Sequence, residues 1–378
     1  MVSVVAKLRT HLLLVALASA ISASASQGNE ARGRQFVSFT SFNSFARETE
    51  PNSSETVFTS PFISTKIKFN EVVVSWNTCL PPDSSLTIEA RAAASAEKTI
   101  KFYTLGCWSS NRGRYPRHSV ADQKDGDGDV DTDTLALHWP ADRLQVRLTI
   151  AGAPLPQPPV KFLGISLADT SVSFEPLPPL RRAWGKLILV PERTQMIYPG
   201  GNVLCSPTTV SMLLGYWAQT LQRPELDKPV PEIADAIYDS QWHGTGNWPF
   251  NMAYAGSFPR LRAYVARLSD IFELEAWIVR RIPLGLSVDY DRLRGKGPGP
   301  NGHLVALVGF TKQGDPIIND PGTSQHVRKV FPRQNLREAW ACSRNTVYLV
   351  YPETAPLPTD RFGHWCSPST IYKPKSDK

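Results

Sequence analysis

The sequence has no apolar stretch long enough for a helix that spans a bilayer, because the longest run, residues 12–21, is too short. It also has no Gly-rich phosphate-binding loop and no His and Cys residues at zinc-binding spacing. The formal net charge is +7, but the basic residues are scattered and form no basic helix with interleaved aromatic residues. We therefore expect no stable membrane span, no metal, no cofactor and no nucleic-acid partner.

An acidic run at residues 125–133 resembles a calcium-binding loop at first sight. The EF-hand loop requires Gly at its sixth position and Glu at its twelfth, and Val130 and Ala136 occupy those positions here. The run therefore predicts a solvated hairpin loop rather than a cation site.

The first 25 residues have the pattern of a secretory signal peptide. Lys7 and Arg9 precede the apolar run, and Ala23-Ser24-Ala25 fits the small-x-small pattern of a cleavage site. An uncleaved membrane anchor is the alternative. We expect an exported protein, secreted or held in the cell envelope. Its mildly basic surface either tolerates anionic envelopes or is an ordinary soluble surface.

The five cysteines are informative in an oxidising compartment, where an odd number leaves one thiol unpaired. Cys79 and Cys107 lie in one region of the chain, and Cys342 and Cys366 lie in another. Local pairing would leave Cys205 free. The sequence leaves this connectivity open.

Hydrophobic residues make up 42% of the chain and charged residues 20%, as in a globular protein, and 378 residues suffice for two domains. Six short runs in the first half alternate apolar and polar residues, with no long helix, which predicts a β-sandwich. The runs are residues 71–76, 85–90, 99–104, 134–138, 144–150 and 162–167. Before them, residues 26–60 are rich in Ser, Thr, Asn and Phe without a helical period, and they predict a flexible leader.

A Pro-rich linker, residues 176–184, precedes a second domain of mixed type. Helical periodicity is followed by apolar strands, and this order predicts an α+β fold. The expected helices are residues 205–220, 230–240, 257–267 and 270–279, and the expected strands are 284–289, 303–311, 315–319 and 346–351. The predicted order is therefore signal peptide (1–25), flexible leader (26–60), β-sandwich domain (61–175), linker (176–184), second domain (185–355) and C-terminal tail (356–378).

Cys205 stands at the predicted start of a helix, because Pro207 suits a first helical turn and apolar residues follow at helical spacing. The helix dipole and free backbone N–H groups at this position favour a thiolate. A buried structural cysteine is the alternative.

A histidine and a carboxylate follow on two expected strands. His303 begins the strand 303–311, and a hairpin turn at residues 312–315 would return Asp320 to its side. A carboxylate there would fix the imidazole tautomer, and the imidazole would act as general base and acid. An ordinary turn aspartate is the alternative, and Asn319 competes as the orienting residue.

These residues carry a resemblance to a known family. Residues 190–195, Cys205 with Ser206-Pro207-Thr208, Gly302-His303 and Asn319-Asp320-Pro321 resemble papain-like cysteine peptidases of the bacteriocin-processing, double-glycine-leader type, family thirty-nine. They are most similar to its stand-alone, secreted relatives, over residues 185–355. The resemblance implies a papain-like fold and a peptide substrate. It also implies that Gln195, which matches a Gln shortly before the family's Cys, helps to form the oxyanion hole.

Two features depart from the family. The family often has Gly after the Cys, where this chain has Ser206, and no transporter membrane domain accompanies the chain. Processing of a bacteriocin leader during export is therefore not implied. We expect a secreted cysteine peptidase with Cys205, His303, Asp320 and Gln195 in its site.

Two alternatives stay open. One is a cell-wall amide hydrolase, and the other is a non-catalytic binding protein with a degenerate peptidase scaffold and an N-terminal domain that contacts glycan or the cell envelope. The aromatic, Gly-rich segment from Trp242 to Trp248, with Tyr254, either lines a substrate cleft or serves packing. His243 and His326 have no recognisable partner in the sequence.

Overall fold

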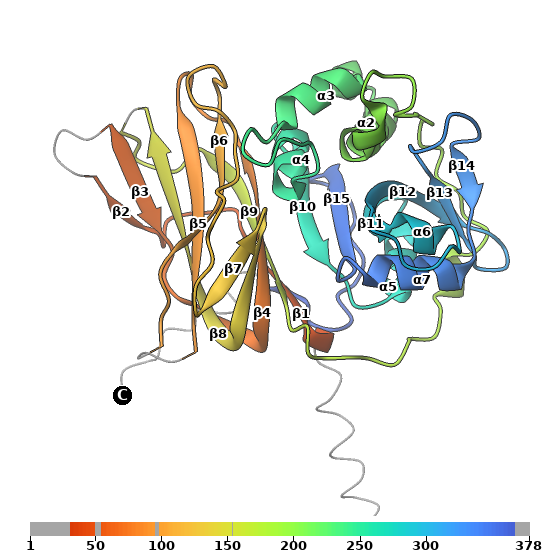
Figure 1. Cartoon of the computed structure of the whole chain (residues 1–378), viewed down its shortest axis with the longest axis horizontal. Helices are drawn as coiled ribbons and strands as arrows, with labels where there is room; N and C mark the ends of the chain where they lie inside the picture. The colour runs from red at the N-terminus through yellow and green to blue at the C-terminus, as the bar shows by residue number, and fades with distance from the viewer. Residues whose placement is uncertain (1–30, 50–53, 95–97, 153, 367–378) are drawn as a thin grey trace, which may run out of the picture.

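The computed structural model describes residues 31–49, 54–94, 98–152 and 154–366. A β-rich N-terminal part lies beside a part that mixes helices and strands (Figure 1). No helix in the described ranges is long and apolar enough to cross a membrane. The predicted signal peptide lies outside these residues.

The N-terminal part forms one hydrogen-bonded sheet of ten strands, which includes β16 from the C-terminal segment. The long strand β8 joins several of the other strands into this sheet. It pairs with β4 and β7 near its start and with β3 and β5 near its end. The strands are β1 (Arg34–Phe39), β2 (Ala46–Glu48), β3 (Glu55–Thr59), β4 (Ile63–Thr78), β5 (Ser85–Ala93), β6 (Tyr103–Ser109), β7 (Gly128–Asp131), β8 (Thr134–Ala151), β9 (Val160–Ala168) and β16 (Trp365–Cys366).

Most expected strands of this part are present, with two differences. The separate runs 134–138 and 144–150 are a single strand, β8, and the run 99–104 overlaps β6 only at its end. The acidic run begins in the loop before β7, includes β7 and ends in the tight turn between β7 and β8. In the loop, Asp125 accepts hydrogen bonds from the backbone N–H groups of Asp127 and Gly128.

Within the described residues, the segment expected to be a flexible leader instead contributes strands to the sheet. β1 pairs with β9 along its whole length, and β2 and β3 form a hairpin beside β8. The Ser- and Thr-rich composition suggested a loop, but phenylalanines distributed along the segment are buried in the core and hold it in place. They are Phe36, Phe39, Phe42, Phe45 and Phe58.

The second part is α+β, as expected, with a six-stranded sheet in the order β10-β15-β11-β12-β13-β14. Its strands are β10 (Leu261–Arg267), β11 (Leu284–Asp289), β12 (Gly302–Phe310), β13 (Pro316–Asn319), β14 (Arg328–Val330) and β15 (Thr346–Pro352). Its helices are α2 (Cys205–Leu221), α3 (Val230–Ile237), α4 (Trp248–Ala255), α5 (Ile271–Val279), α6 (Tyr290–Leu293) and α7 (Arg333–Ala341). Short 3-10 turns are η1 (Ala31–Gly33), η2 (Arg181–Ala183), η3 (Gly201–Val203) and η4 (Pro224–Leu226).

The expected helix at residues 257–267 is wrong. Residues 261–267 are β10, which pairs antiparallel with β15, and the helix of this region is α4, earlier in the chain. Nearly every residue of β10 is buried, so its apolar residues do not alternate, and a short run of that kind fits a helix as well as a strand.

Side chains of the N-terminal part cover the free edge of β10. The Asn77 amide pairs with both backbone groups of Ala263, accepting from its N–H at 3.0 Å and donating to its C=O at 2.6 Å. Ser75 and Ser166 accept hydrogen bonds from the backbone N–H groups of Val265 and Arg267. An exposed sheet edge is a site of unwanted pairing, so this cover makes the N-terminal part a structural support of the second sheet.

Candidate active site

Cys205 is the first residue of α2, as the sequence predicted, and Pro207 lies in the first turn. The thiol is half-buried, whereas the next turns of the helix are fully buried. Thr209 donates a hydrogen bond to the backbone oxygen of Leu304 at 3.1 Å, which fixes the start of α2 against β12 beside His303.

His303 and Asp320 are brought together by the β12–β13 hairpin. The two strands pair antiparallel, and His303 Nε2 lies 2.8 Å from Asp320 Oδ1. Both side chains are buried, with residue exposures of 5% and 1%. The expected return of Asp320 to the side of His303 is therefore present.

Asn319, the other candidate for the residue that orients His303, is hydrogen-bonded to other groups. Its amide nitrogen donates to the backbone oxygens of Val190 and Pro191, and its oxygen accepts from Arg328. It ties β13 to the segment that leads toward Gln195. Asp320 is thus the carboxylate that orients His303.

The side chains of Cys205 and His303 lie close enough that each shifts the pKa of the other, through hydrogen bonding and through charge. Because Nε2 of His303 is engaged by Asp320, the ring nitrogen that remains for the thiol is Nδ1. The imidazole therefore lies between a thiol and a carboxylate, in the order that a cysteine nucleophile requires.

The surroundings favour the charged forms of all three groups. Burial opposes a charged thiolate, but the hydrogen bond and charge of His303 lower the pKa of Cys205 below its usual value, aided by backbone N–H groups. Burial also opposes a charged His303, yet the hydrogen bonds to Asp320 and Cys205 raise its pKa to about 9. Burial likewise opposes the Asp320 carboxylate, and the bond to His303 lowers its pKa.

Two residues that the sequence did not single out hold this arrangement. The Tyr290 hydroxyl donates to Asp320 Oδ2 at 2.9 Å, and its ring lies 4.0 Å from the His303 ring between centroids. The Gly322 N–H donates to Asp320 Oδ1, and a Cβ at Gly322 would come within 2.8 Å of the Tyr290 hydroxyl and 3.0 Å of the His303 ring. The sequence signals are weak: Tyr290 directly follows an apolar strand, and Gly322 follows Pro321 in a turn.

Ser206, the departure from the family pattern, is fully buried. Its hydroxyl shares a hydrogen bond of 2.9 Å with the hydroxyl of Tyr348 on β15. The chain thus provides a polar partner for the side chain that replaces Gly, and the position after Cys205 is held by the sheet.

Gln195 lies in the loop between the linker and α2. Its N–H donates to the backbone oxygen of Pro321 at 3.0 Å, next to Asp320, and its carbonyl accepts from Tyr198 in the turn that leads to Cys205. The side chain is 3% exposed, and its Oε1 atom has no hydrogen-bond partner among the described residues. The backbone of Gln195 is thus fixed beside the site, with a buried amide oxygen left unpaired.

The other described cysteines are free and do not form the local pair considered from the sequence. Cys79 Sγ lies 3.9 Å from the backbone oxygen of Ser257, and Cys107 Sγ lies 3.7 Å from the hydroxyl of Thr87. The two thiols have different neighbours because Cys107 is within β6 and Cys79 follows the end of β4. Cys342 is also free and exposed. In the described residues, no group of His, Cys, Asp and Glu could hold a metal ion.

Two family models match the chain, one for each part. Residues 187–348 match the model described as Peptidase_C39 like family, and residues 21–168 match the Peptidase C39 N-terminal domain. No curated protein matches the chain.

One solved structure resembles the chain weakly. It is the CBM22-1–GH10 modules of Clostridium thermocellum endo-1,4-beta-D-xylanase 10B with xylohexaose, at 7% identity and a TM-score of 0.15. The similarity covers 42% of this chain and 30% of that chain, and it carries no argument.

Proposed function

The chain belongs to the C39-like peptidase family through both of its parts, and we propose that it is an active, secreted cysteine peptidase that cleaves peptide bonds. The observation that carries the proposal is the position of His303, bonded on one side to Asp320 and on the other to Cys205. Secretion follows from the signal-peptide pattern of residues 1–25. The proposal also assigns a papain-like fold to the second domain and a β-sandwich fold to the N-terminal domain.

The first chemical step is acylation of Cys205. Its thiolate attacks the scissile carbonyl, a C–S bond forms, and the carbonyl electrons move to the oxygen. We assign the Gln195 amide and the Cys205 backbone N–H to that oxyanion. When the C–N bond breaks, the His303 imidazolium gives its proton to the leaving amine.

Deacylation reverses these roles. A water molecule loses its proton to His303 and attacks the thioester, and the C–S bond breaks to release a carboxylic acid and regenerate the thiolate. Asp320 keeps the imidazole in the tautomer that serves both steps. The buried, hydrogen-bonded Asp320 needs no change of protonation state.

The test compares the mature protein with its Cys205→Ala variant on a library of peptides, with products identified by mass spectrometry. Cleavage that is absent from Cys205→Ala but retained by Cys342→Ala supports the proposal. Cleavage that survives Cys205→Ala overturns it. Release of stem peptides from cell-wall material, with no cleavage of linear peptides, would indicate the cell-wall amide hydrolase instead.

Iodoacetamide labelling tests the thiolate without any substrate. Cys205 is half-buried while Cys79 and Cys342 are exposed, so exposure alone predicts that Cys205 reacts more slowly. A thiolate paired with His303 reverses this order at neutral pH. Labelling of Cys205 no faster than of Cys342, or unchanged by His303→Ala, would remove the pair from the mechanism.

A further inference from the structure

A loop of the second part lies directly against the segment that leads to Cys205. We call residues 239–248 the Trp242 loop. The Thr245 hydroxyl in this loop donates to the backbone oxygen of Val203 at 3.1 Å, and Val203 closes the 3-10 turn that precedes α2. The Trp242 loop therefore forms part of the surroundings of the nucleophile.

The indole of Trp242 is unusually exposed for its size. Half of the residue is exposed to solvent, whereas tryptophans are buried on average. Gly244 and Gly246 lie beneath the ring, since a Cβ at either position would come within 2.5 Å and 2.8 Å of ring atoms. The two glycines let the ring lie against its own loop. Packing of the core does not explain this position, because much of the ring remains open.

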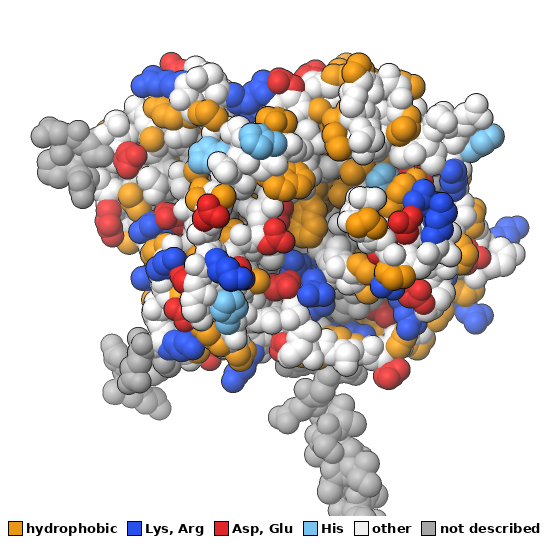
Figure 2. Space-filling view, viewed as in Figure 1, with side chains coloured by type: hydrophobic (Ala, Val, Ile, Leu, Met, Phe, Trp, Pro, Cys, Tyr) orange, Lys and Arg blue, Asp and Glu red, His pale blue; other side chains and the backbone are white. Residues whose placement is uncertain are grey.

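Exposed apolar side chains also lie on the segment that leads to Cys205, against which the Trp242 loop is bonded. Val203 is 63% exposed, and Met196 and Ile197, directly after Gln195, are 47% and 70% exposed. The turn brings them close in space, because a Cβ on Gly201 would lie 3.3 Å from the Cα of Met196. Charged side chains of both signs are interspersed on the face shown in Figure 2, and apolar side chains gather in the hollow between the two parts.

The Trp242 loop is held from within by Asp239. This carboxylate is fully buried, and one of its oxygens accepts the backbone N–H groups of Gln241 and Trp242 at 3.1 Å each. Its other oxygen accepts from the Asn247 amide at 2.9 Å, which closes the loop.

The N-terminal part holds the same loop at both ends. At one end, the Ser119 N–H donates to Asp239 at 3.0 Å, and Ser240 donates to the backbone oxygen of Arg117. At the other end, Asp133 accepts the N–H of Trp248 at 2.7 Å. A loop fixed from two sides keeps its exposed ring in one place, as a binding site requires.

We propose that the exposed face of Trp242 binds an apolar side chain of the peptide substrate beside the scissile bond, and that the N-terminal part positions the loop that carries it. The proposal rests on the proposed peptidase function. It assigns Trp242 to substrate specificity and Asp239 to positioning. An aromatic ring of this kind gives a large apolar contact at low cost in conformational entropy.

The test uses fluorogenic peptides of one length that differ only by Leu or Ser at single positions around the cleaved bond. For the Leu peptide that the wild type prefers, Trp242→Ala raises KM about tenfold with little change in kcat, because burial of one apolar side chain is partly lost. The Ser peptide is little affected, and Trp242→Phe restores most of the preference. Val330→Ala, at an exposed apolar residue on the edge strand β14, is the matched control and leaves KM unchanged.

Asp239→Asn tests the positioning role. It keeps the shape of the side chain but replaces one acceptor oxygen with a donor, so the loop loses its closure to Asn247 or its backbone contacts. We expect the same rise in KM as for Trp242→Ala, with an unchanged rate of iodoacetamide labelling at Cys205. A thermal unfolding curve separates this effect from general destabilisation.

Binding to the Cys205→Ala variant separates the two proposals. Fluorescence polarisation of the labelled Leu peptide should show weaker binding when Trp242→Ala is added. If the peptides are cleaved but neither KM nor this binding depends on Trp242, the inference is wrong and the peptidase function stands. If no peptide is cleaved or bound, the peptidase function fails first. Binding of xylan or peptidoglycan fragments in a Trp242-dependent manner, with no peptide binding, would assign the ring to a glycan and overturn the inference.

Discussion

Two buried histidine–carboxylate pairs occur in the described chain, and only one of them is beside a thiol. His303 lies 2.8 Å from Asp320 in the candidate site, and His364 lies 2.9 Å from Glu273 near the C-terminus. Both histidines are almost fully buried, at 5% and 3% exposed. The two pairs are nearly equal in distance and burial, so these properties do not mark a catalytic histidine.

The second ring nitrogen distinguishes the pairs. That of His303 faces Cys205, whose side chain helps to raise the pKa of the imidazole. Nε2 of His364 has no hydrogen-bond partner in the described part of the chain, and its ring lies against Phe362, 5.3 Å between centroids. A histidine oriented by a carboxylate through one ring nitrogen can exchange a proton with a reacting group only if its other ring nitrogen faces that group.

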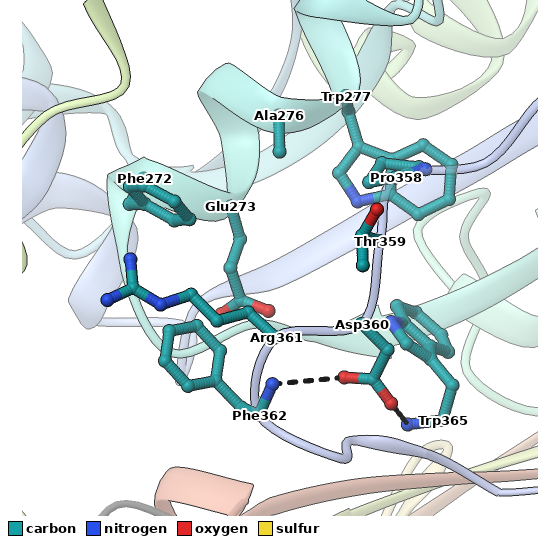
Figure 3. A pocket seen from close by; sticks show the side chains of 10 residues that line it. All are labelled: Phe272, Glu273, Ala276, Trp277, Pro358, Thr359, Asp360, Arg361, Phe362 and Trp365. Carbon is teal, nitrogen blue, oxygen red and sulfur yellow. Dashed lines mark hydrogen bonds between the residues drawn. The ribbon is translucent and has the colours of Figure 1, made fainter.

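The His364 pair instead attaches the C-terminal segment to α5. Glu273 on this helix also accepts the N–H and hydroxyl of Ser269, and burial of its charge is offset by these bonds, which lower its pKa. Figure 3 shows the same region, where Asp360 accepts the N–H groups of Phe362 and Trp365. Beyond it, β16 pairs with β1 of the N-terminal part. The pair is therefore a structural connection between the two parts of the chain.

The largest expected effect is on catalysis, and it separates the pairs most clearly. His303→Ala removes the general base, which contributes a factor on the order of 10²–10⁴, so kcat/KM falls by at least that range. His364→Ala leaves kcat/KM unchanged for the folded fraction. Peptide cleavage by the two variants at equal folded concentration measures the difference. If folded His364→Ala lost as much activity as His303→Ala, the assignment of catalysis to the His303 pair alone would be wrong.

The second expected effect is on stability. His364→Ala removes the ring that is hydrogen-bonded to the buried Glu273 carboxylate, and leaving a buried charged group without such a partner costs about 3 kcal/mol. We expect urea unfolding at pH 7 to show a free energy of unfolding lower by that amount. The double variant His364→Ala/Glu273→Gln, which removes the charge, should recover much of the loss. An unchanged midpoint in His364→Ala would show that the C-terminal segment contributes nothing to folding.

The third expected effect is a dependence on pH at the His303 pair. The folded-state pKa of His303 is raised from 6.5 to about 9, so its stabilising contribution is complete below about pH 6.5 and is lost as the pH rises through 9. The lowered pKa of Cys205 keeps its thiolate at pH values below those at which an ordinary cysteine ionises. We expect the alkylation rate of Cys205 in wild type to be high well below pH 9.

The His303→Ala variant is the control for this profile. Without the imidazolium, burial dominates and raises the pKa of Cys205, so rapid alkylation begins only at more alkaline pH. His364→Ala should follow the wild-type profile. Identical profiles for wild type and His303→Ala would contradict the ion pair.

Much of the site follows from local sequence signals. Pro207 and the apolar periodicity after it place Cys205 at a helix start, and a short turn between two apolar strands returns Asp320 toward His303. Each of these two predictions needs only one local element, a helix or a hairpin, and the family resemblance linked Cys205 to His303 across the chain. No local element and no resemblance points to His364 and Glu273, whose contact joins segments 91 residues apart.

Long-range packing also explains the errors in the fold. The local sequence of β10 predicts a helix. Its pairing with β15 and its contacts with Ser75 and Asn77 make it a strand instead. The supposed leader becomes ordered because β9 lies beside β1. In each case a neighbour distant in sequence decides the structure, and single-sequence periodicity carries no information about that neighbour.

Tyr290→Phe is the finest test of the comparison, since it changes one hydrogen bond in the catalytic pair and leaves the ring that covers His303. The lost bond from the Tyr290 hydroxyl to the charged Asp320 is worth about 1.5–3 kcal/mol. Because that bond helps to keep Asp320 ionised, its loss weakens the stabilisation of the His303 imidazolium. We therefore expect about a tenfold lower kcat with KM unchanged, and a His303 pKa, measured by NMR titration of the ring, that moves down from about 9. A fall in thermal stability with an unchanged His303 pKa would instead reduce Tyr290 to a packing residue, and the His303 pair would then owe its properties to Asp320 and Cys205 alone.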